Sequence, residues 1–260
     1  MLNFNILEIM KKNGIYFLSI VLALFSIQTV VFAEKKEKKD SITYVVKTNI
    51  DGQGTDLFIE FHKGKEHNHP TMAVWIETMD EEFVETLYIT KSVATGFFGH
   101  GEKSEGIWSK EPGPAYRPAT LPYWFHKRTR EKKNDIPTPE NPVPDAITGA
   151  TPPGSFIIDS RSEKILEGKF RIVAEINQTW DWNEYWNNTK YPDDMEYKTS
   201  CQPALIYAVT VDPGKPDKKF YLNPIGHSHY SGKNGELYTD LSTFTTALDI
   251  FEKIIVKLDR

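Results

Sequence analysis

The sequence predicts an all-β protein: an antiparallel immunoglobulin-like β-sandwich with a long proline-rich loop and a short C-terminal helix. About nine short segments are rich in β-branched and aromatic residues, and turn-forming residues separate them. Strands and helices do not alternate regularly, as they would in a parallel α/β sheet. Residues 71–89 hold two apolar runs around an acidic turn at Asp80 and show no helical periodicity, which predicts a β-hairpin.

The expected strands occupy residues 42–50, 57–61, 71–78, 83–89, 155–159, 169–176, 203–211, 220–222 and 254–258. A turn at Asp51-Gly52-Gln53-Gly54 separates the first two, so these are expected to pair as a hairpin. Ser242 is a suitable N-cap for a short helix that extends to Phe251. Together these segments form a single β-sandwich domain over residues 42–260.

Residues 92–153 form the long loop. Ten of the 16 prolines lie between Pro112 and Pro153, which favours extended and turn conformations. Residues 121–130 are the exception, because Pro122 suits the first turn of a short helix. The basic run at 127–133 is expected to be solvated.

The first 33 residues predict a signal peptide. Lys11 and Lys12 precede an apolar run over residues 15–32, and Val31-Phe32-Ala33 matches a signal-peptidase site. A charged tether follows at 34–41. An uncleaved anchor is the alternative, because the apolar run approaches membrane-spanning length. We therefore expect a periplasmic or secreted protein that meets the membrane only through this segment.

Charge and cysteine content exclude several classes of function. The formal net charge of −5 argues against a nucleic-acid partner. Cys201 is the only cysteine, so an internal disulfide, a thiol redox pair and a cysteine-based zinc site are excluded. A redox role would require a bound cofactor.

One heptapeptide has a possible chemical meaning. The pattern Asp-x-x-Thr-Gly-Ala-Thr resembles the flavin-attachment motif of FMN-binding domains in membrane electron-transport complexes. Its defined positions are Asp145, Thr148, Gly149, Ala150 and Thr151. The resemblance implies covalent FMN, joined to Thr151 through a phosphoester bond. The alternative is a structural turn. The Pro-Pro-Gly sequence that follows departs from the motif, which continues with further Thr or Ser and a helix.

Two histidine pairs suggest a metal site. His67 and His69, and likewise His227 and His229, are two residues apart, so the members of each pair would face one side of a strand. Four converging imidazoles could hold copper or zinc. The alternative is that both pairs lie in polar loops and never meet.

Further aromatic side chains suit either a stacking platform for a flavin or sugar ring or a cover for one end of the core. They are Trp180, Trp182, Tyr185 and Trp186. No serine lies in a Gly-x-Ser-x-Gly nucleophile elbow, and no glycine-rich phosphate loop is present.

Several stretches together resemble the periplasmic domain-of-unknown-function family 2271, whose members recur beside flavin transferases and PepSY-type membrane reductases. They are Met-Ala-Val-Trp-Ile-Glu at 72–77, Phe-Val-Glu-Thr-Leu at 83–87, Arg-Pro-Ala-Thr-Leu-Pro at 117–122 with Trp124, the heptapeptide, and Gly-Lys-Phe-Arg-Ile-Val-Ala-Glu at 168–175. The resemblance implies an exported sandwich that has a flavin transferase or membrane reductase as its partner.

These observations predict an exported, non-enzymatic accessory or binding module linked to an extracytoplasmic flavin or redox system. One alternative is an electron-transfer protein that carries covalent FMN on Thr151. The other is a metal-binding protein that uses the four histidines.

Overall fold

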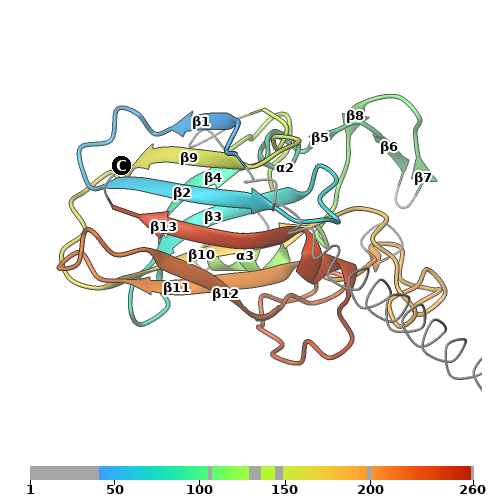
Figure 1. The fold of residues 1–260 in the computed structure, drawn as a ribbon. Coiled ribbons are helices and arrows are strands. Elements are labelled where there is room, and N and C mark those ends of the chain that lie inside the picture. Colours follow the sequence, from blue (N-terminus) through green and yellow to red (C-terminus); the bar gives the residue numbers. More distant parts are fainter. Residues whose placement is uncertain (1–40, 105–106, 129–135, 144–148, 198–200, 259–260) are drawn as a thin grey trace, which may run out of the picture. The chain divides into compact units, whose positions relative to one another are not determined.

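Nine strands form one continuous sheet in the computed structural model, which describes residues 41–104, 107–128, 136–143, 149–197 and 201–258 (Figure 1). They are β1 (Tyr44–Thr48), β2 (Asp56–Lys63), β3 (Thr71–Glu77), β4 (Phe83–Ile89), β9 (Phe156–Arg161), β10 (Phe170–Asn177), β11 (Leu205–Val211), β12 (Phe220–His227) and β13 (Phe251–Lys257). Each segment that the sequence predicted as a strand overlaps one of these nine. The all-β class is therefore confirmed.

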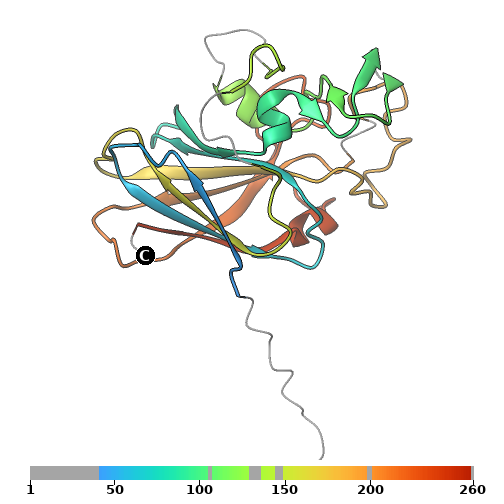
Figure 2. The same cartoon turned by 90° about the horizontal axis from the view of Figure 1, so that it is seen from above.

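The strand order is β1-β9-β2-β13-β12-β11-β10-β3-β4. Every neighbouring pair is antiparallel except β1 and β9, which run parallel. The sheet curls until β4, at one end of this order, contacts β9 near the other. Figure 2 shows the two facing walls, which are joined through β12 because this strand pairs with both β11 and β13. The result is one nearly closed barrel, and the immunoglobulin-like sandwich is not confirmed.

Two hydrophobic clusters stabilise the sheet. The larger one fills the space between the two walls and includes Phe61, Phe156 and Ile172. The second lies on the outer face of β3, β10 and β11, where Trp75 and Val173 pack against residues of the 92–153 segment. Strand β10 is consequently buried on both faces, which explains its nearly continuous run of apolar residues.

The 92–153 segment contains regular structure and covers one outer face of the barrel. Its described part includes α2 (Lys91–Thr95), α3 (Pro122–Arg128), and short strands that pair as β5 (Phe97–Phe98) with β8 (Gly113–Pro114) and β6 (Glu102–Ser104) with β7 (Ile107–Trp108). The expected helix near Pro122 is confirmed as α3. Gly96 ends α2 at a φ of 62°, where an added Cβ would lie 2.3 Å from the Pro137 carbonyl oxygen, so only glycine fits.

A buried carboxyl group on the sheet holds the first turn of α3. The Glu175 side chain of β10 accepts hydrogen bonds from the backbone N–H groups of Tyr123 (3.1 Å) and Trp124 (2.7 Å). These are orphan donors at a helix start, and Glu175 supplies the acceptor that a capping residue normally provides. Burial raises the pKa of Glu175 to about 8, although these hydrogen bonds and the Ser228 hydroxyl partly oppose the shift.

Two local expectations from the sequence are wrong. The segments 42–50 and 57–61 do not form a hairpin, because β9 lies between β1 and β2 and pairs with both. The helix expected between Ser242 and Phe251 is a single 3₁₀ turn, η2 (Thr246–Asp249), and Phe251 already begins β13.

The expected signal peptide and nearly all of the expected tether lie outside the described residues. No helix within the described part of the chain is long and apolar enough to span a membrane.

Candidate functional site

A cavity of about 480 Å³ lies where the start of β3, the start of α2 and the turn before β9 meet. It brings together residues from both sites that the sequence predicted separately: Ala150 and Thr151 of the heptapeptide and His69 of the first histidine pair. The remaining lining residues are Pro70, Thr71, Thr90, Lys91, Ser92, Thr95 and Phe97.

Thr151 lies in the buried wall of this cavity, with only 2% of its surface exposed. Its hydroxyl donates a hydrogen bond of 2.6 Å to the Pro70 carbonyl oxygen. The hydroxyl oxygen of Thr151 also lies 3.1 Å from the hydroxyl oxygen of Thr90. Because Thr151 already donates to Pro70, Thr90 is the donor in this contact, and the Met72 carbonyl oxygen at 3.3 Å is a second acceptor for the same proton. The Thr90 oxygen in turn accepts from the Met72 backbone N–H at 2.9 Å. These bonds link β3, the loop before α2 and the heptapeptide.

This geometry speaks against Thr151 as the attachment point for FMN. A phosphoester bond would displace the hydroxyl from both of its partners and place a bulky group in a packed position. An added Cβ at Gly149 would meet nothing within 4 Å, so packing does not require glycine there. Asp145 and Thr148 lie outside the described residues. In this structure, the Thr151 hydroxyl connects the turn before β9 to Pro70 and Thr90.

His67 is a core residue. It is 7% exposed, and its ring packs edge-on against Phe251 with 5.2 Å between ring centroids. Neither ring nitrogen has a hydrogen-bond partner among the described residues. Burial, reinforced by Lys63, lowers the pKa of His67 to about 4, so the ring is neutral at pH 7. His69, by contrast, is exposed and lines the cavity.

His227 and His229 are held by local partners. The His227 Nδ1 atom donates to the Ser228 carbonyl oxygen at 2.8 Å, and the His229 Nδ1 atom accepts from the Ser231 backbone N–H at 3.1 Å. Within the part of the chain that the structure describes, no three His, Cys, Asp or Glu side chains are grouped to hold a metal ion. Among the described residues, the four imidazoles are therefore not grouped as the expected four-histidine site requires.

The charged groups of the cavity favour an anion. Lys91 is exposed at the start of α2, and the His69 imidazole adds a group that can form hydrogen bonds. No Asp or Glu is among the lining residues. Thr71, Ser92 and Thr95 contribute hydroxyls, while Pro70 and the half-exposed Phe97 supply apolar surface. This combination suits a small molecule that carries both an anionic group and an apolar part.

Other polar groups were not predicted from the sequence. Thr90, Lys91 and Ser92 follow β4 directly, and their only signal was a polar triplet after an apolar strand. The buried Glu77 and Glu175 had a clearer signal, since each is a charged residue in an otherwise apolar strand.

The aromatic residues of the 180–186 stretch differ in burial. Trp186 is buried beside Phe244 as part of the core, whereas Trp180 is 70% exposed.

Comparisons of the chain with family models, curated proteins and solved structures find no match.

Proposed function

We propose that the protein is an exported, non-enzymatic binding module that holds a small anion with an apolar part in the cavity beside Lys91. The observation that carries this proposal is the lining itself, in which the exposed Lys91 is not accompanied by any Asp or Glu. The barrel supplies a rigid frame, since the Thr90–Thr151 hydrogen bond fixes two of the lining segments relative to each other.

The N-terminal sequence supports export, because a basic start, an apolar run and a small-residue cleavage site occur in the order of a signal peptide. The resemblance to family 2271 supports a place beside an extracytoplasmic flavin or redox system, with a flavin transferase or membrane reductase as partner. FMN is therefore the first ligand to test, because it joins a planar ring system to a phosphate. Here it would bind non-covalently.

The binding test compares FMN with riboflavin, which has the same ring system without the phosphate. We expect FMN to bind more tightly in a fluorescence titration, and Lys91→Gln to weaken FMN binding by about tenfold, since a hydrogen bond to a charged group contributes ~1.5–3 kcal/mol. Lys215→Gln is the matched control, because this exposed lysine does not line the cavity. Equal binding of riboflavin, or an unchanged affinity in Lys91→Gln, would contradict the anion site.

Export has a separate test. After expression of the full chain and cell fractionation, we expect the mature protein outside the cytoplasm, with an N-terminal sequence that begins at Glu34. A cytoplasmic protein that retains its N-terminal segment would overturn this part of the proposal.

A further inference from the structure

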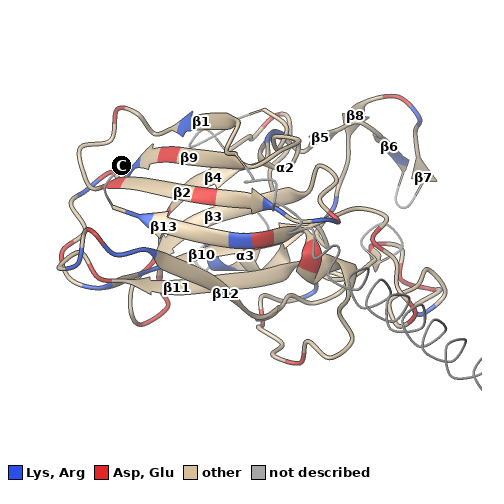
Figure 3. Ribbon diagram, in the orientation of Figure 1, with Lys and Arg blue, Asp and Glu red and all other residues tan. Residues whose placement is uncertain are grey.

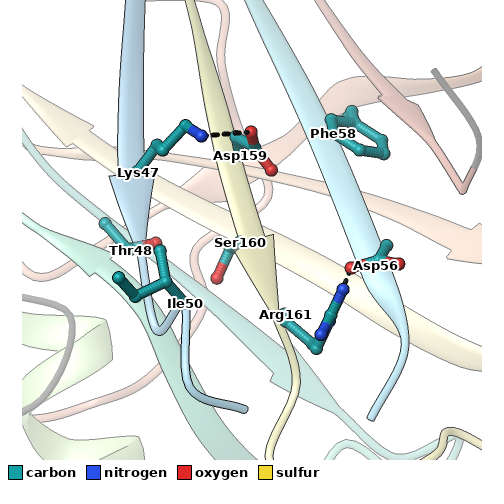
Figure 4. A pocket seen from close by; sticks show the side chains of 8 residues that line it. All are labelled: Lys47, Thr48, Ile50, Asp56, Phe58, Asp159, Ser160 and Arg161. Carbon is teal, nitrogen blue, oxygen red and sulfur yellow. Dashed lines mark hydrogen bonds and ion pairs between the residues drawn. The ribbon is translucent and has the colours of Figure 1, made fainter. Parts of the chain in front are cut away.

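Lys190 has aromatic partners where several other cations of this protein have carboxylate partners. In the pocket beside β1, β9 and β2, Lys47 pairs with Asp159 (Figure 4). Arg161 of the same pocket pairs with Asp56. Charges of both signs are interspersed over the strands of the sheet (Figure 3). Among the described residues, the Lys190 ammonium forms neither an ion pair nor a hydrogen bond, and it lies against three aromatic rings instead.

The three rings surround the ammonium group. The Lys190 Nζ atom lies 3.3 Å from the centroid of the Tyr185 ring. The ring centroids of Trp186 and Tyr191 lie 5.3 Å and 5.7 Å from the same atom. All three distances fall within the ~6 Å over which a ring face attracts a cation. These three rings form an aromatic cage, which is the arrangement by which proteins recognise quaternary ammonium groups.

Contacts outside the aromatic cage hold two of its walls in place. The Trp186 indole N–H donates a hydrogen bond to the Thr243 hydroxyl at 3.1 Å, and Trp186 is only 6% exposed. The Tyr191 ring stacks on the Tyr230 ring, with 3.9 Å between ring centroids and an interplanar angle of 6°. Both of these partners follow β12 in the sequence. The shape of the cage therefore does not depend on Lys190 alone.

The present occupant of the cage can leave it. Lys190 is half-buried and Tyr185 is 48% exposed, so the cage is open to solvent on one side. Residues 178–197, which form the cage, contain five Asp and Glu residues and Lys190 as their single Lys or Arg. Lys233 balances one of these carboxylates by pairing with Asp194 at 3.5 Å. The remaining negative charge favours a ligand that is a cation.

We propose that the aromatic cage binds a small organic cation with a quaternary ammonium group, such as choline, and that Lys190 occupies the cage when this ligand is absent. The lysine and the ligand then compete for the same ring faces. A quaternary ammonium has no N–H groups to desolvate, so the rings replace its water at a lower cost than they do for a primary ammonium. None of the cage residues lines the cavity beside Lys91.

The first test compares choline with its neutral isostere, 3,3-dimethylbutan-1-ol, by calorimetry on the purified protein. The two molecules have nearly the same shape, but a quaternary carbon replaces the charged nitrogen in the alcohol. We expect choline to bind at least about fivefold more tightly, because only the cation is attracted by the ring faces. Equal binding of the neutral alcohol would overturn the proposal.

Substitutions in the cage and at its occupant should act in opposite directions. Tyr185→Leu should weaken choline binding about fivefold, whereas Tyr185→Phe keeps the ring and should bind choline nearly as the wild type does. Lys190→Ala should tighten choline binding about threefold or more, because the fraction of molecules with an open cage rises. Lys218→Ala is the matched control, since this exposed lysine lies over the Phe220 ring, outside the cage, and its loss should leave choline binding unchanged.

Tighter binding to Lys190→Ala together with weaker binding to Tyr185→Leu would support the site, because a general loss of packing would weaken both. The proposal is overturned if choline binds neither the wild type nor Lys190→Ala, which would leave the Lys190 contact as a structural one only. It is also overturned if Lys190→Ala binds choline no more tightly than Lys218→Ala does. These two outcomes decide the question even if Tyr185→Leu fails to fold.

Discussion

Thr151 shows how a single hydroxyl can have a structural role within a sequence that resembles a modification motif. Its two hydrogen bonds reach Pro70 and Thr90, and Pro70 is 81 residues away in the sequence. We predict that Thr151→Val, which keeps the shape of the side chain, lowers the free energy of unfolding by about 1–3 kcal/mol, because the buried partners lose their bonds. Urea unfolding measures the change. Thr95→Val, at a hydroxyl in a more exposed position, should stay within ~0.5 kcal/mol.

The same residue allows a direct check of the attachment motif. When the protein is expressed together with a flavin transferase, we expect its intact mass to remain that of the unmodified chain. A gain equal to FMN that disappears in Thr151→Ala would show that the turn opens far enough to expose this hydroxyl.

His67 illustrates a second residue whose burial decides its role. Its pKa is about 4 in the folded protein and 6.5 ordinarily, so the unfolded chain binds the extra proton between these values. The contribution of His67 to stability is therefore present above pH 6.5 and is lost as the pH falls towards 4. We predict that His67→Phe, which keeps the contact with Phe251, raises stability most at pH 4.5 and least at pH 7. Thermal melting across this range tests it, and a difference that is the same at every pH would contradict it.

At the scale of single elements, the position of α3 depends on Glu175. Its pKa is raised from 4.5 to about 8, so between these values the folded protein holds a proton that the unfolded chain has released. The free energy of unfolding contributed by this group therefore falls as the pH rises through that window. We predict that the free energy of unfolding of Glu175→Gln lacks this contribution and therefore falls less steeply as the pH rises. It should also be less stable than the wild type by about 1–3 kcal/mol at pH 5, because the amide NH₂ leaves one backbone N–H of α3 unpaired.

Urea unfolding at pH 5, 6, 7 and 8 measures the effect as the difference between wild type and variant. Histidines that titrate in this range cancel, because both proteins contain them. Glu252→Gln is the matched control, because this glutamate is exposed and forms a surface ion pair with Lys253. Parallel pH profiles for wild type and Glu175→Gln would show that Glu175 does not titrate as described.

The elements also show what local sequence can and cannot predict. All nine strands were predicted, because β-branched and aromatic runs between turn signals are a local property. The pairing of the strands was not predicted, because it depends on contacts between distant residues. Asn49, for example, bonds to the Arg161 carbonyl oxygen across 112 residues, and no turn signal indicates such a contact. The candidate sites depend on pairing. Ala150 and His69 border one cavity only because distant segments meet there, and the heptapeptide gave no sign that Thr151 would be covered.

At the scale of the whole molecule, the barrel is nearly closed but keeps β1 at one end of the strand order. This strand pairs only with β9 and is mostly exposed, and Val46 is its one apolar side chain packed against the core. We predict that a chain beginning at residue 49 still folds, at a cost on the order of 2 kcal/mol, because only a few net backbone hydrogen bonds of ~0.5–1.5 kcal/mol are lost. A chain beginning at residue 41, which retains β1, is the control.

Removing β1 has a second consequence, because β9 becomes an edge with unpaired backbone groups. The shortened chain should therefore self-associate, whereas the control should keep the oligomeric state of the wild type. Size-exclusion chromatography with light scattering measures this state. The shortened chain should retain FMN binding in the cavity beside Lys91, because no residue of β1 lines that cavity. Complete unfolding of the shortened chain would show instead that the parallel β1–β9 pair is required to hold the two walls of the barrel together.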